Sequence, residues 1–428
     1  MNFHLNNFQL IKRLKSSSEF TKNIFVLISG TGIAQAIPIA ISPILTRLYT
    51  PKDFGLLGLY ISICSMLGIM GSLRYDAAII QSDNNEEAKQ LVIVSFISTF
   101  LFSLLLFLII LFFNEEITSL LNSPDIQNWL FSIPLTVFLV SAFYITSFWL
   151  NRLKRFLDMS VNRVINKSTD SAVSLLLGIL GVLRQGLLLG YIIGQFVMIS
   201  LLFRKIKKDN FIFNKKRARL VLRKYIEYPK FFLPSTILSE ISSNVFLILI
   251  SVFYGGVITG FYSLVYRVTY LPLGLIGNSI GEVYRQKANE HYLEYGNCKE
   301  LFFKTFKTLF VIGLFPFLVL FFFSEYLFVL VFGPEWKIAG EISKYFSFLI
   351  FFQFISTPLS FTIFLNKSQK KEMILQLFRT VFTILSVVIG FYYKDYMIAI
   401  IIMVVVYCIY YIFNSLLQYR AAIGTLNS

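Results

Sequence analysis

The amino-acid sequence predicts an all-α polytopic membrane protein, and three observations support this: its composition, the length of its apolar runs and the placement of its basic residues. The chain of 428 residues is 56% hydrophobic and only 14% charged, with a mean hydropathy of +0.70. Soluble domains carry about 25% charged residues, which form their polar exterior. This chain has too few charged residues for such an exterior, so we expect its surface to contact lipid. Its apolar runs are about twenty residues long, the length that a helix needs to cross the hydrocarbon core.

Twelve such runs follow one another, and we expect them to be transmembrane helices packed as two six-helix bundles. The breaks at residues 183–185 and 394–395 are short enough for tight hairpins between antiparallel helices. The first run is not a cleavable signal, because a second run follows at once and no small-residue cleavage site separates them. The expected spans are residues 24–45, 54–80, 91–113, 129–150, 161–182, 186–203, 231–253, 257–284, 301–323, 342–365, 373–393 and 396–417.

Lysine and arginine residues indicate the orientation of these spans. With the amino terminus inside, 30 of the 39 basic residues fall on the inner side and six on the outer side. Eleven of them lie between Arg204 and Lys230. This bias predicts that both termini are cytoplasmic. It also explains the net charge of +16 without nucleic acid. We interpret the stretch from Arg204 to Lys230 as an anchor on anionic lipid rather than as a site for a specific partner.

Cysteine and histidine are too scarce to suggest a disulfide framework or a metal site. The three cysteines are far apart, and Cys64 and Cys408 lie inside apolar runs. The two histidines, His4 and His291, are isolated. We therefore expect no metal and no cofactor.

The chain contains an internal repeat. Three residues after the first span match three residues after the seventh at a constant offset of 205 positions. Six spans per half is an even number, so the halves share one orientation and should be related by an axis along the membrane normal. We predict an amino-terminal bundle at 1–203, a basic linker at 204–230 and a carboxyl-terminal bundle at 231–428. The matched pairs are Tyr49 with Tyr254, Gly55 with Gly260 and Leu59 with Leu264.

Two stretches resemble the polysaccharide-exporting flippases of bacteria, which belong to the multidrug/oligosaccharidyl-lipid/polysaccharide exporter superfamily. The first is LTRLYTPKDFG at 45–55, followed by LRYDAAI at 73–79 and EEA at 86–88. The second runs from residue 260 to 286. The resemblance implies an inner-membrane protein that translocates oligosaccharide repeat units on undecaprenyl diphosphate, for O-antigen or capsule. Membrane lipid is then a further partner, and a polysaccharide polymerase and a chain-length regulator stay open as protein partners.

A diphosphate with sugars needs a polar, positively charged route through the membrane, so charged residues inside spans are the candidates for the site. A charged side chain at the centre of a membrane-spanning helix costs roughly 2.5–3.5 kcal/mol, so we expect each one to have a role. Arg267 lies near the middle of the eighth span. Glu240 lies at similar depth in the seventh, one turn before Asn244. Glu240 either neutralises Arg267 or binds a proton or cation coupled to transport.

Other polar residues form a second group near the cytoplasmic side. Arg74 and Asp76 are two residues apart, so on one helix they would face different ways and not pair. Span five carries a polar stripe at spacings of three and four, which we place at the cytoplasmic mouth of the cavity. Arg379 could join it. The stripe consists of Arg163, Asn166, Lys167, Asp170 and Ser174.

The neutral and peripheral candidates complete the predicted site. Gln35, Asn278 and Gln353 could contact sugars or hold helices together. The predicted substrate-binding residues are Arg267, Arg74, Arg163, Lys167, Arg379, Arg47, Gln35 and Asn278. The predicted ion-coupling residues are Glu240, Asp76, Asp170 and Glu282.

The sequence carries no phosphate-binding loop of the GxxxxGK[ST] type, and its longest connection is too short for a catalytic domain, so we do not expect an enzyme. The leading interpretation is a flippase working by alternating access. Two alternatives stay open: a cation-coupled multidrug exporter of the same superfamily, and a non-transporting scaffold of a polysaccharide assembly complex.

Overall fold

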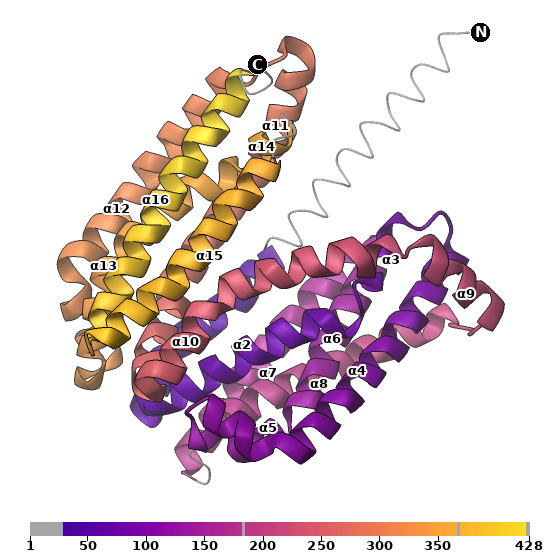
Figure 1. Ribbon diagram of the computed structural model, residues 1–428, viewed down its shortest axis with the longest axis horizontal. Coiled ribbons are helices and arrows are strands. Elements are labelled where there is room, and N and C mark those ends of the chain that lie inside the picture. Colours follow the sequence, from indigo (N-terminus) through magenta and orange to yellow (C-terminus); the bar gives the residue numbers. More distant parts are fainter. Residues whose placement is uncertain (1–28, 182–184, 366–368, 425–428) are drawn as a thin grey trace.

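The computed structural model describes residues 29–181, 185–365 and 369–424, and these form helices with no strand among them. Ten helices within these ranges are long and apolar enough to cross a membrane. The helices form two arms that diverge toward one end of the molecule (Figure 1). The predicted fold class, a polytopic helical protein with two bundles, is confirmed.

The amino-terminal arm begins with the helix Ser29–Leu48. Its other elements are α2 (Pro51–Gly71), α3 (Tyr75–Gln81), α4 (Asn85–Leu120), η1 (Pro124–Ile126), α5 (Gln127–Leu130), α6 (Ile133–Arg152), α7 (Phe156–Leu180), α8 (Gly186–Ile206), η2 (Lys207–Asp209), α9 (Lys215–Lys224) and η3 (Tyr228–Phe232).

The second half of the chain starts with a long helix that runs along α2 before the chain enters the other arm (Figure 1). The elements are α10 (Leu233–Val265), η4 (Tyr266–Tyr270), α11 (Leu271–Tyr295), α12 (Lys299–Phe332), η5 (Pro334–Trp336), α13 (Lys337–Ser356), η6 (Thr357–Leu359), α14 (Phe361–Leu365), α15 (Gln369–Tyr392) and α16 (Tyr396–Ile423). Because α10 lies along α2, the division of the chain at residues 203 and 230 stays a prediction.

Three of the twelve expected spans differ from simple apolar helices. The fifth is α7, which carries too many polar residues to count as one of the ten. The seventh and eighth are joined in one continuous helical path from α10 through η4 into α11. Gly255 separates them as a single residue with φ +81° and ψ 176°, a conformation that glycine adopts without strain. The connection is therefore a kink and not a loop.

The second predicted span also contains a break in the helix, which its hydrophobicity did not indicate. Helix α2 ends at Gly71, and Leu73 and Arg74 both have positive φ, at 51° and 63°. The left-handed turn starts the short helix α3 in a new direction. The predicted continuous span over residues 54–80 is therefore wrong, and residues on either side of the turn do not follow helical spacing.

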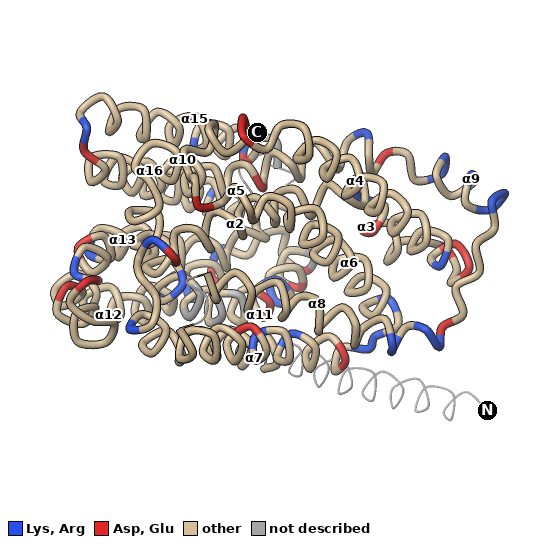
Figure 2. Tube along the Cα trace, turned by 90° about the horizontal axis from the view of Figure 1, so that it is seen from below, with Lys and Arg blue, Asp and Glu red and all other residues tan. Residues whose placement is uncertain are grey.

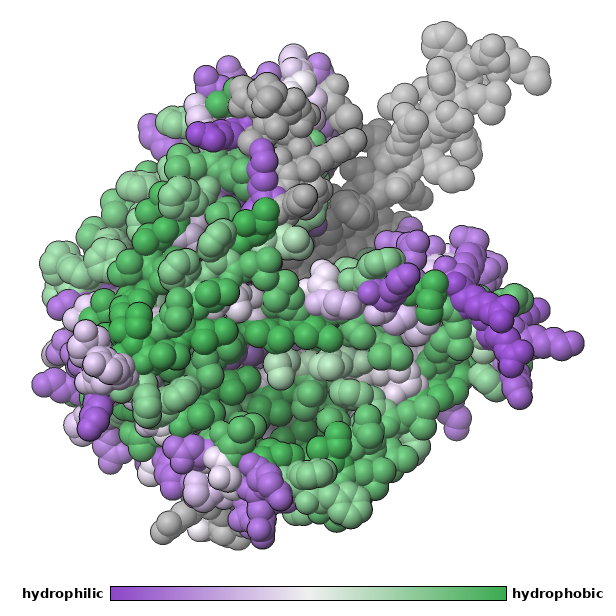
Figure 3. Space-filling model, viewed as in Figure 1, coloured by the Kyte–Doolittle hydropathy of each residue, from purple (hydrophilic) through white to green (hydrophobic). Residues whose placement is uncertain are grey.

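Apolar side chains cover the outside of the arms. The most hydrophobic windows of α4 and α12 are only 17% and 11% buried, so most of their apolar residues face outward. In Figure 3 this apolar surface extends over both arms, and the hydrophilic residues gather at their ends. Figure 2 shows lysines and arginines concentrated at and around α9. An apolar belt with polar ends is the surface that a bilayer requires.

The two halves touch most closely where α2 crosses the part of α10 that follows Gly255. A Cβ atom on Gly55 would lie 1.8 Å from the Gly256 carbonyl oxygen, and one on Gly260 would lie 1.7 Å from the Pro51 oxygen. The offset of 205 converts one contact into the other. We call this contact of Pro51, Gly55, Gly256 and Gly260 the glycine crossing. Its reciprocity is what a two-fold axis between the helices produces.

The residues next to the glycine crossing place the axis itself. A Cβ on Gly58 would lie 2.2 Å from Oγ of Ser263, which is the residue at offset 205 from it. The matched tyrosines behave alike: Tyr49 donates from its hydroxyl to the carbonyl oxygen of Ser174 in α7 at 2.7 Å, and Tyr254 donates to that of Val387 in α15 at 3.4 Å. The predicted repeat is thus present in three dimensions.

Further contacts between the halves lie near the glycine crossing, at the end of the molecule opposite α9, which we call the closed end. They tie the first helix and the α4–α5 connection to the second half. The contacts are Arg47 Nη1 to the Val331 oxygen at 3.1 Å, Trp336 Nε1 to the Thr46 oxygen at 3.2 Å, and Asn122 Nδ2 to the Val252 oxygen at 2.9 Å.

Candidate functional site

A cavity of about 430 Å³ lies between the halves, and we call it the central cavity. Its wall comes from the first helix, α2, α7, α10 and η4, so both halves contribute. Gly58 and Ser263, which flank the axis, belong to this wall. Substrate sites at the interface of repeated halves are typical of secondary transporters. The charged residues on the wall are Lys167, Asp170, Glu240 and Arg267.

Arg267 is the residue that reaches this wall from the second half. It lies in η4, a π-helical turn of five residues between α10 and α11. Such turns insert an extra residue into a helix and frequently mark functional sites. Its guanidinium carbon is 5.6 Å from the centre of the Phe54 ring on α2. Among the described residues, no carboxylate lies within 4 Å of Arg267, although Asp170 exerts an attraction from farther away.

Lys167 and Asp170 occupy the opposite wall, on α7. Nζ of Lys167 is 3.7 Å from Oδ2 of Asp170, and it lies 5.9 Å from the centre of the Tyr191 ring. The predicted polar stripe of span five is divided. Asn166 and Ser174 are buried against α8, where glycines at 190 and 194 leave room for them. Only the Lys167–Asp170 part of the stripe faces the central cavity.

Glu240 reaches the central cavity from α10. Nδ2 of Asn244 donates to Oε2 of Glu240 at 3.3 Å, as the spacing of one turn allows. Within the described residues no ion pair joins Glu240 to Arg267. The positive charge that acts on Glu240 is that of Arg74. Simple neutralisation of Arg267 by Glu240 is therefore not what the structure shows.

Arg74 and Asp76 form an ion pair, which corrects the prediction that they face different ways. Nη1 of Arg74 is 3.6 Å from Oδ2 of Asp76, and both side chains are buried. The reason is the left-handed turn at Leu73 and Arg74, which removes these residues from a continuous helix. The guanidinium also lies 4.9 Å from the ring centre of Phe232, near the start of the seventh span.

Arg163 lies between these groups and the first helix. Its Nη1 donates to the hydroxyl of Thr31 at 2.7 Å, and its guanidinium carbon is 6.0 Å from the centre of the Phe143 ring. No ion pair within 4 Å involves Arg163 in the described part of the chain. It does not belong to the wall of the central cavity, but it is partly exposed on the same helix as Lys167.

The remaining predicted residues lie elsewhere. Arg379 does not join the stripe of span five: it sits 5.1 and 4.7 Å from the ring centres of Tyr407 and Tyr410 on α16. Glu282 is exposed on α11 and is not on the cavity wall. Arg47 bridges the halves at the closed end. The side chain of Asn278 lies outside the described residues.

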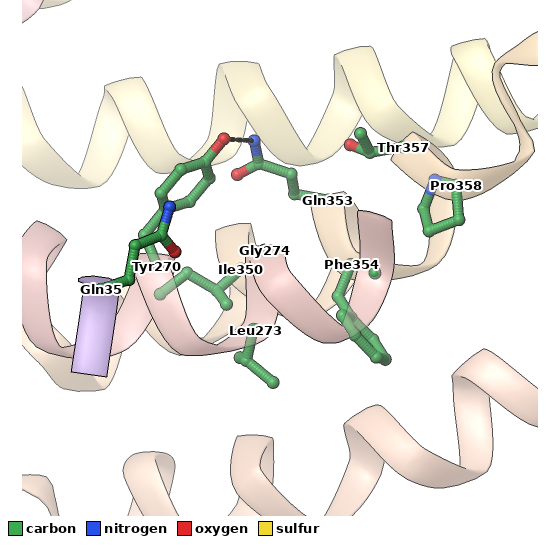
Figure 4. A pocket seen from close by; sticks show the side chains of 10 residues that line it. Gln35, Tyr270, Leu273, Gly274, Ile350, Gln353, Phe354, Thr357 and Pro358 are labelled. Carbon is green, nitrogen blue, oxygen red and sulfur yellow. Dashed lines mark hydrogen bonds between the residues drawn. The ribbon is translucent and has the colours of Figure 1, made fainter. Parts of the chain in front are cut away.

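A smaller pocket of about 100 Å³ shares Gln35 with the central cavity, and Figure 4 shows the residues that line it. Nε2 of Gln353 donates to the hydroxyl of Tyr270 at 3.3 Å, and Gln35 points toward this pair (Figure 4). Gln35 and Gln353, predicted as neutral polar contacts, thus lie close together. Their amides offer both donors and acceptors to a ligand.

Sequence reasoning missed a row of tyrosines. Tyr262, Tyr266 and Tyr270 recur every four residues, and their rings stack at 6.5 and 4.5 Å between centres. Tyr262 and Tyr266 line the central cavity, and Tyr270 lines the smaller pocket. We call these three residues the tyrosine row. The spacing of four was the available signal, because it places side chains on one helix face.

A profile of the polysaccharide biosynthesis protein family matches residues 44–341. The chain belongs to this family. The match includes the end of the first helix, the glycine crossing, the polar helix α7 and the π-helical turn with Arg267. It confirms the resemblance that residues 45–55 and 260–286 indicated. No curated protein matches the chain.

Solved structures with the same fold are transporters and a flippase. Lipid II flippase MurJ in an inward closed conformation superposes with a TM-score of 0.73 at 15% identity, over 94% of this chain and 91% of that one. An inward-facing multidrug resistance MATE family transporter of the MOP superfamily gives 0.67 at 13% identity, over 94% and 96%. An outward-facing one gives 0.59 at 15% identity, over 95% and 97%. At these identities the similarity shows the fold alone.

Proposed function

We propose that this member of the polysaccharide biosynthesis protein family is a flippase. It would carry an oligosaccharide linked to undecaprenyl diphosphate from the inner to the outer leaflet of a bacterial cytoplasmic membrane, for a surface polysaccharide such as O-antigen or capsule. The observation that carries this proposal is Arg267, a charged residue that lines the central cavity between the halves and has no ion pair with any described residue.

An arginine in this position fits an anionic ligand. Keeping a cation inside the membrane costs roughly 2.5–3.5 kcal/mol, and no carboxylate among the described residues lies within 4 Å of Arg267 to form an ion pair with it. A diphosphate can accept two parallel hydrogen bonds from a guanidinium. Lys167 on the facing wall and Arg163 nearby supply further positive charge. The polyprenyl tail can stay in lipid while the head crosses.

The sugar part of the ligand would meet the tyrosine row and the two glutamines. Pockets for small ligands combine aromatic faces with a few polar groups that fix orientation. Here the aromatic faces are stacked on η4, next to Arg267, and the amides of Gln35 and Gln353 lie at their end. The tyrosines proposed to contact sugars are therefore adjacent to the arginine proposed to bind phosphate, along the helical path of α10 and η4.

The distribution of basic residues supports one direction of transport. In this proposal the end with α9 and both termini are cytoplasmic, and the closed end faces outward. The central cavity would then receive its ligand from the inside, and rocking of the arms would open the closed end. Asp170 and Glu240 are the acids on the cavity wall that could couple this motion to a proton or cation gradient.

The same two acids support a second candidate, a cation-coupled exporter of amphiphilic cations. Asp170 and Glu240 balance the formal charges of Lys167 and Arg267 on the wall, and aromatic residues surround them. A cavity of this composition could hold an organic cation by its acids and a ring system by its tyrosines. The two candidates require different signs of charge from the cavity.

The decisive experiment measures translocation in vesicles that contain the purified chain and a labelled polyprenyl-diphosphate oligosaccharide. Arg267→Ala should reduce the rate about 10- to 100-fold, the equivalent of one charge-assisted hydrogen bond to phosphate. Arg267→Lys should retain part of the rate. Arg285→Ala, an exposed arginine on α11, is the matched control and should transport normally.

Two outcomes would contradict the flippase. One is wild-type protein that does not move the labelled lipid above the rate of empty vesicles. The other is an Arg267→Ala variant that moves it normally. Export of an organic cation that Glu240→Gln abolishes and Arg267→Ala leaves intact would support the second candidate.

A further inference from the structure

The outer surface of the amino-terminal arm contains a second hollow, far from the axis between the halves. Its volume is about 610 Å³, and it lies between α4 and α9. No residue of α4 or α9 belongs to the wall of the central cavity. The transport mechanism described above does not use it. Its lining residues are Leu73, Val94, Ile97, Ser98, Leu101, Phe102, Leu105, Phe213, Lys215, Ala218, Arg219 and Leu222.

The floor of this hollow is one face of α4. Its members recur at intervals of three and four residues from Val94 to Leu105, the spacing of a single helix face. Ile97, Leu101 and Leu105 are 46%, 58% and 53% exposed, although all three are apolar. The twelve residues from Val94 to Leu105 span a rise of about 16 Å, close to half of a 30 Å hydrocarbon core. The apolar floor therefore has the length of one leaflet.

Helix α9 closes the hollow at its polar end and is held there by specific contacts. Nζ of Lys224 lies 2.7 Å from Oδ2 of Asp83 and 2.8 Å from Oε2 of Glu87. These two carboxylates raise the pKa of Lys224 above its usual value. Nη1 of Arg217 lies 3.4 Å from Oε2 of Glu86. One set of basic residues on α9 thus attaches the helix to the acids around the start of α4.

A second set of basic residues on α9 is not used in this way. Lys215 and Arg219 are one turn apart, both are exposed, and both line the hollow. In the described part of the chain neither has a carboxylate within 4 Å. Two cations at the polar mouth of an apolar groove are complementary to an anionic headgroup that carries acyl chains.

We propose that the hollow between α4 and α9 binds an anionic phospholipid from the leaflet at the α9 end, with its phosphate at Lys215 and Arg219 and an acyl chain along α4. A lipid held there would fix α9, and with it the linker between the halves, to the amino-terminal arm. The occupant is a structural lipid and not the transported one, because the hollow is separate from the central cavity.

The test uses the full chain, purified and freed of lipid, and native mass spectrometry with added dioleoyl phosphatidylglycerol or dioleoyl phosphatidylcholine. The double variant Lys215→Ala/Arg219→Ala should weaken phosphatidylglycerol binding about 30-fold, since each basic residue near an anionic lipid contributes about a factor of five. Lys216→Ala/Arg223→Ala removes the same charge from exposed positions on α9 that do not line the hollow, and should change binding less than about threefold.

A second variant tests the groove without changing any charge. Leu101→Trp fills the apolar floor and should also reduce phosphatidylglycerol binding, while the melting temperature without lipid stays close to that of the wild type. Inorganic phosphate at the same concentration should not compete, because the acyl chain contributes to binding. Equal losses in the two double variants, or equal binding of the two lipids by the wild type, would overturn the proposal.

Discussion

The glycine crossing gives the most quantitative prediction. Replacing Gly55 by alanine adds a Cβ atom 1.8 Å from the Gly256 carbonyl oxygen, whereas ordinary van der Waals contact begins at 3.4 Å. The backbones of α2 and α10 must therefore separate by about 1.6 Å, since the contact is with main-chain atoms that cannot change rotamer. Overpacking of this kind costs about 1–3 kcal/mol. Under the proposed alternating access, this penalty applies only to the conformation in which the closed end is shut.

The expected consequence is a change of population rather than loss of folding. A penalty of 1–3 kcal/mol lowers the ratio of shut to open molecules about 5- to 150-fold. The assay is cross-linking with a short bifunctional thiol reagent between cysteines at positions 122 and 252, whose wild-type residues meet across the halves at 2.9 Å. The three native cysteines, Cys64, Cys298 and Cys408, are replaced first. Gly55→Ala should cross-link far less than the parent.

The matched control is a substitution of Gly256, the residue whose carbonyl oxygen forms the other side of the same contact. A Cβ on Gly256 would meet nothing closer than the Lys52 side chain at 3.4 Å, so Gly256→Ala should cross-link like the parent. Both variants change glycine to alanine in a helix. If both cross-link equally, the closeness of the crossing does not control the shut state, and the reasoning fails.

Three further predictions concern stability and can be measured by thermal unfolding in detergent. Tyr49→Phe removes a hydrogen bond of 2.7 Å and should destabilise the protein by about 1 kcal/mol. Tyr254→Phe removes a hydrogen bond of 3.4 Å and should destabilise it less. Equal shifts of the melting temperature in the two variants would contradict this. Arg74→Ala leaves the buried Asp76 unpaired and should cost about 3–5 kcal/mol, and adding Asp76→Ala should recover part of the loss. Trp336→Ala empties a fully buried site between two phenylalanines and should cost about 3–5 kcal/mol; a loss below 1 kcal/mol would show that the site collapses.

The parts of the fold that were predicted correctly depend on signals spread over many residues. Hydrophobic runs of twenty residues gave the spans, and a constant offset of 205 located the repeat, whose glycines at 55 and 260 meet in the structure. Both signals have a physical cause. Contact with lipid requires the apolar runs, and the close approach of two backbones requires the repeated glycines. Five residues that the sequence analysis named separately, Arg267, Lys167, Asp170, Glu240 and Gln35, line one cavity in the structure, and their roles stay predictions.

The predictions that were wrong depend on the conformation of single residues, which the sequence does not indicate. Positive φ at Leu73 and Arg74 brought Arg74 next to Asp76, because helical spacing no longer applied. Arg379 met Tyr407 and Tyr410 on α16, a contact that depends on how two helices turn toward each other. Helix rotation is set by packing over the whole bundle, so no local pattern could have revealed it.

The position of the glycine crossing determines how far a rotation of the arm moves the other end of α2. From Gly55 to the end of α2 at Gly71 the helix rises about 24 Å. Swinging the arm by ten degrees about the crossing would shift that far tip by about 4 Å. A small rotation where two backbones touch is thus converted into a displacement of several ångströms at the other end of α2.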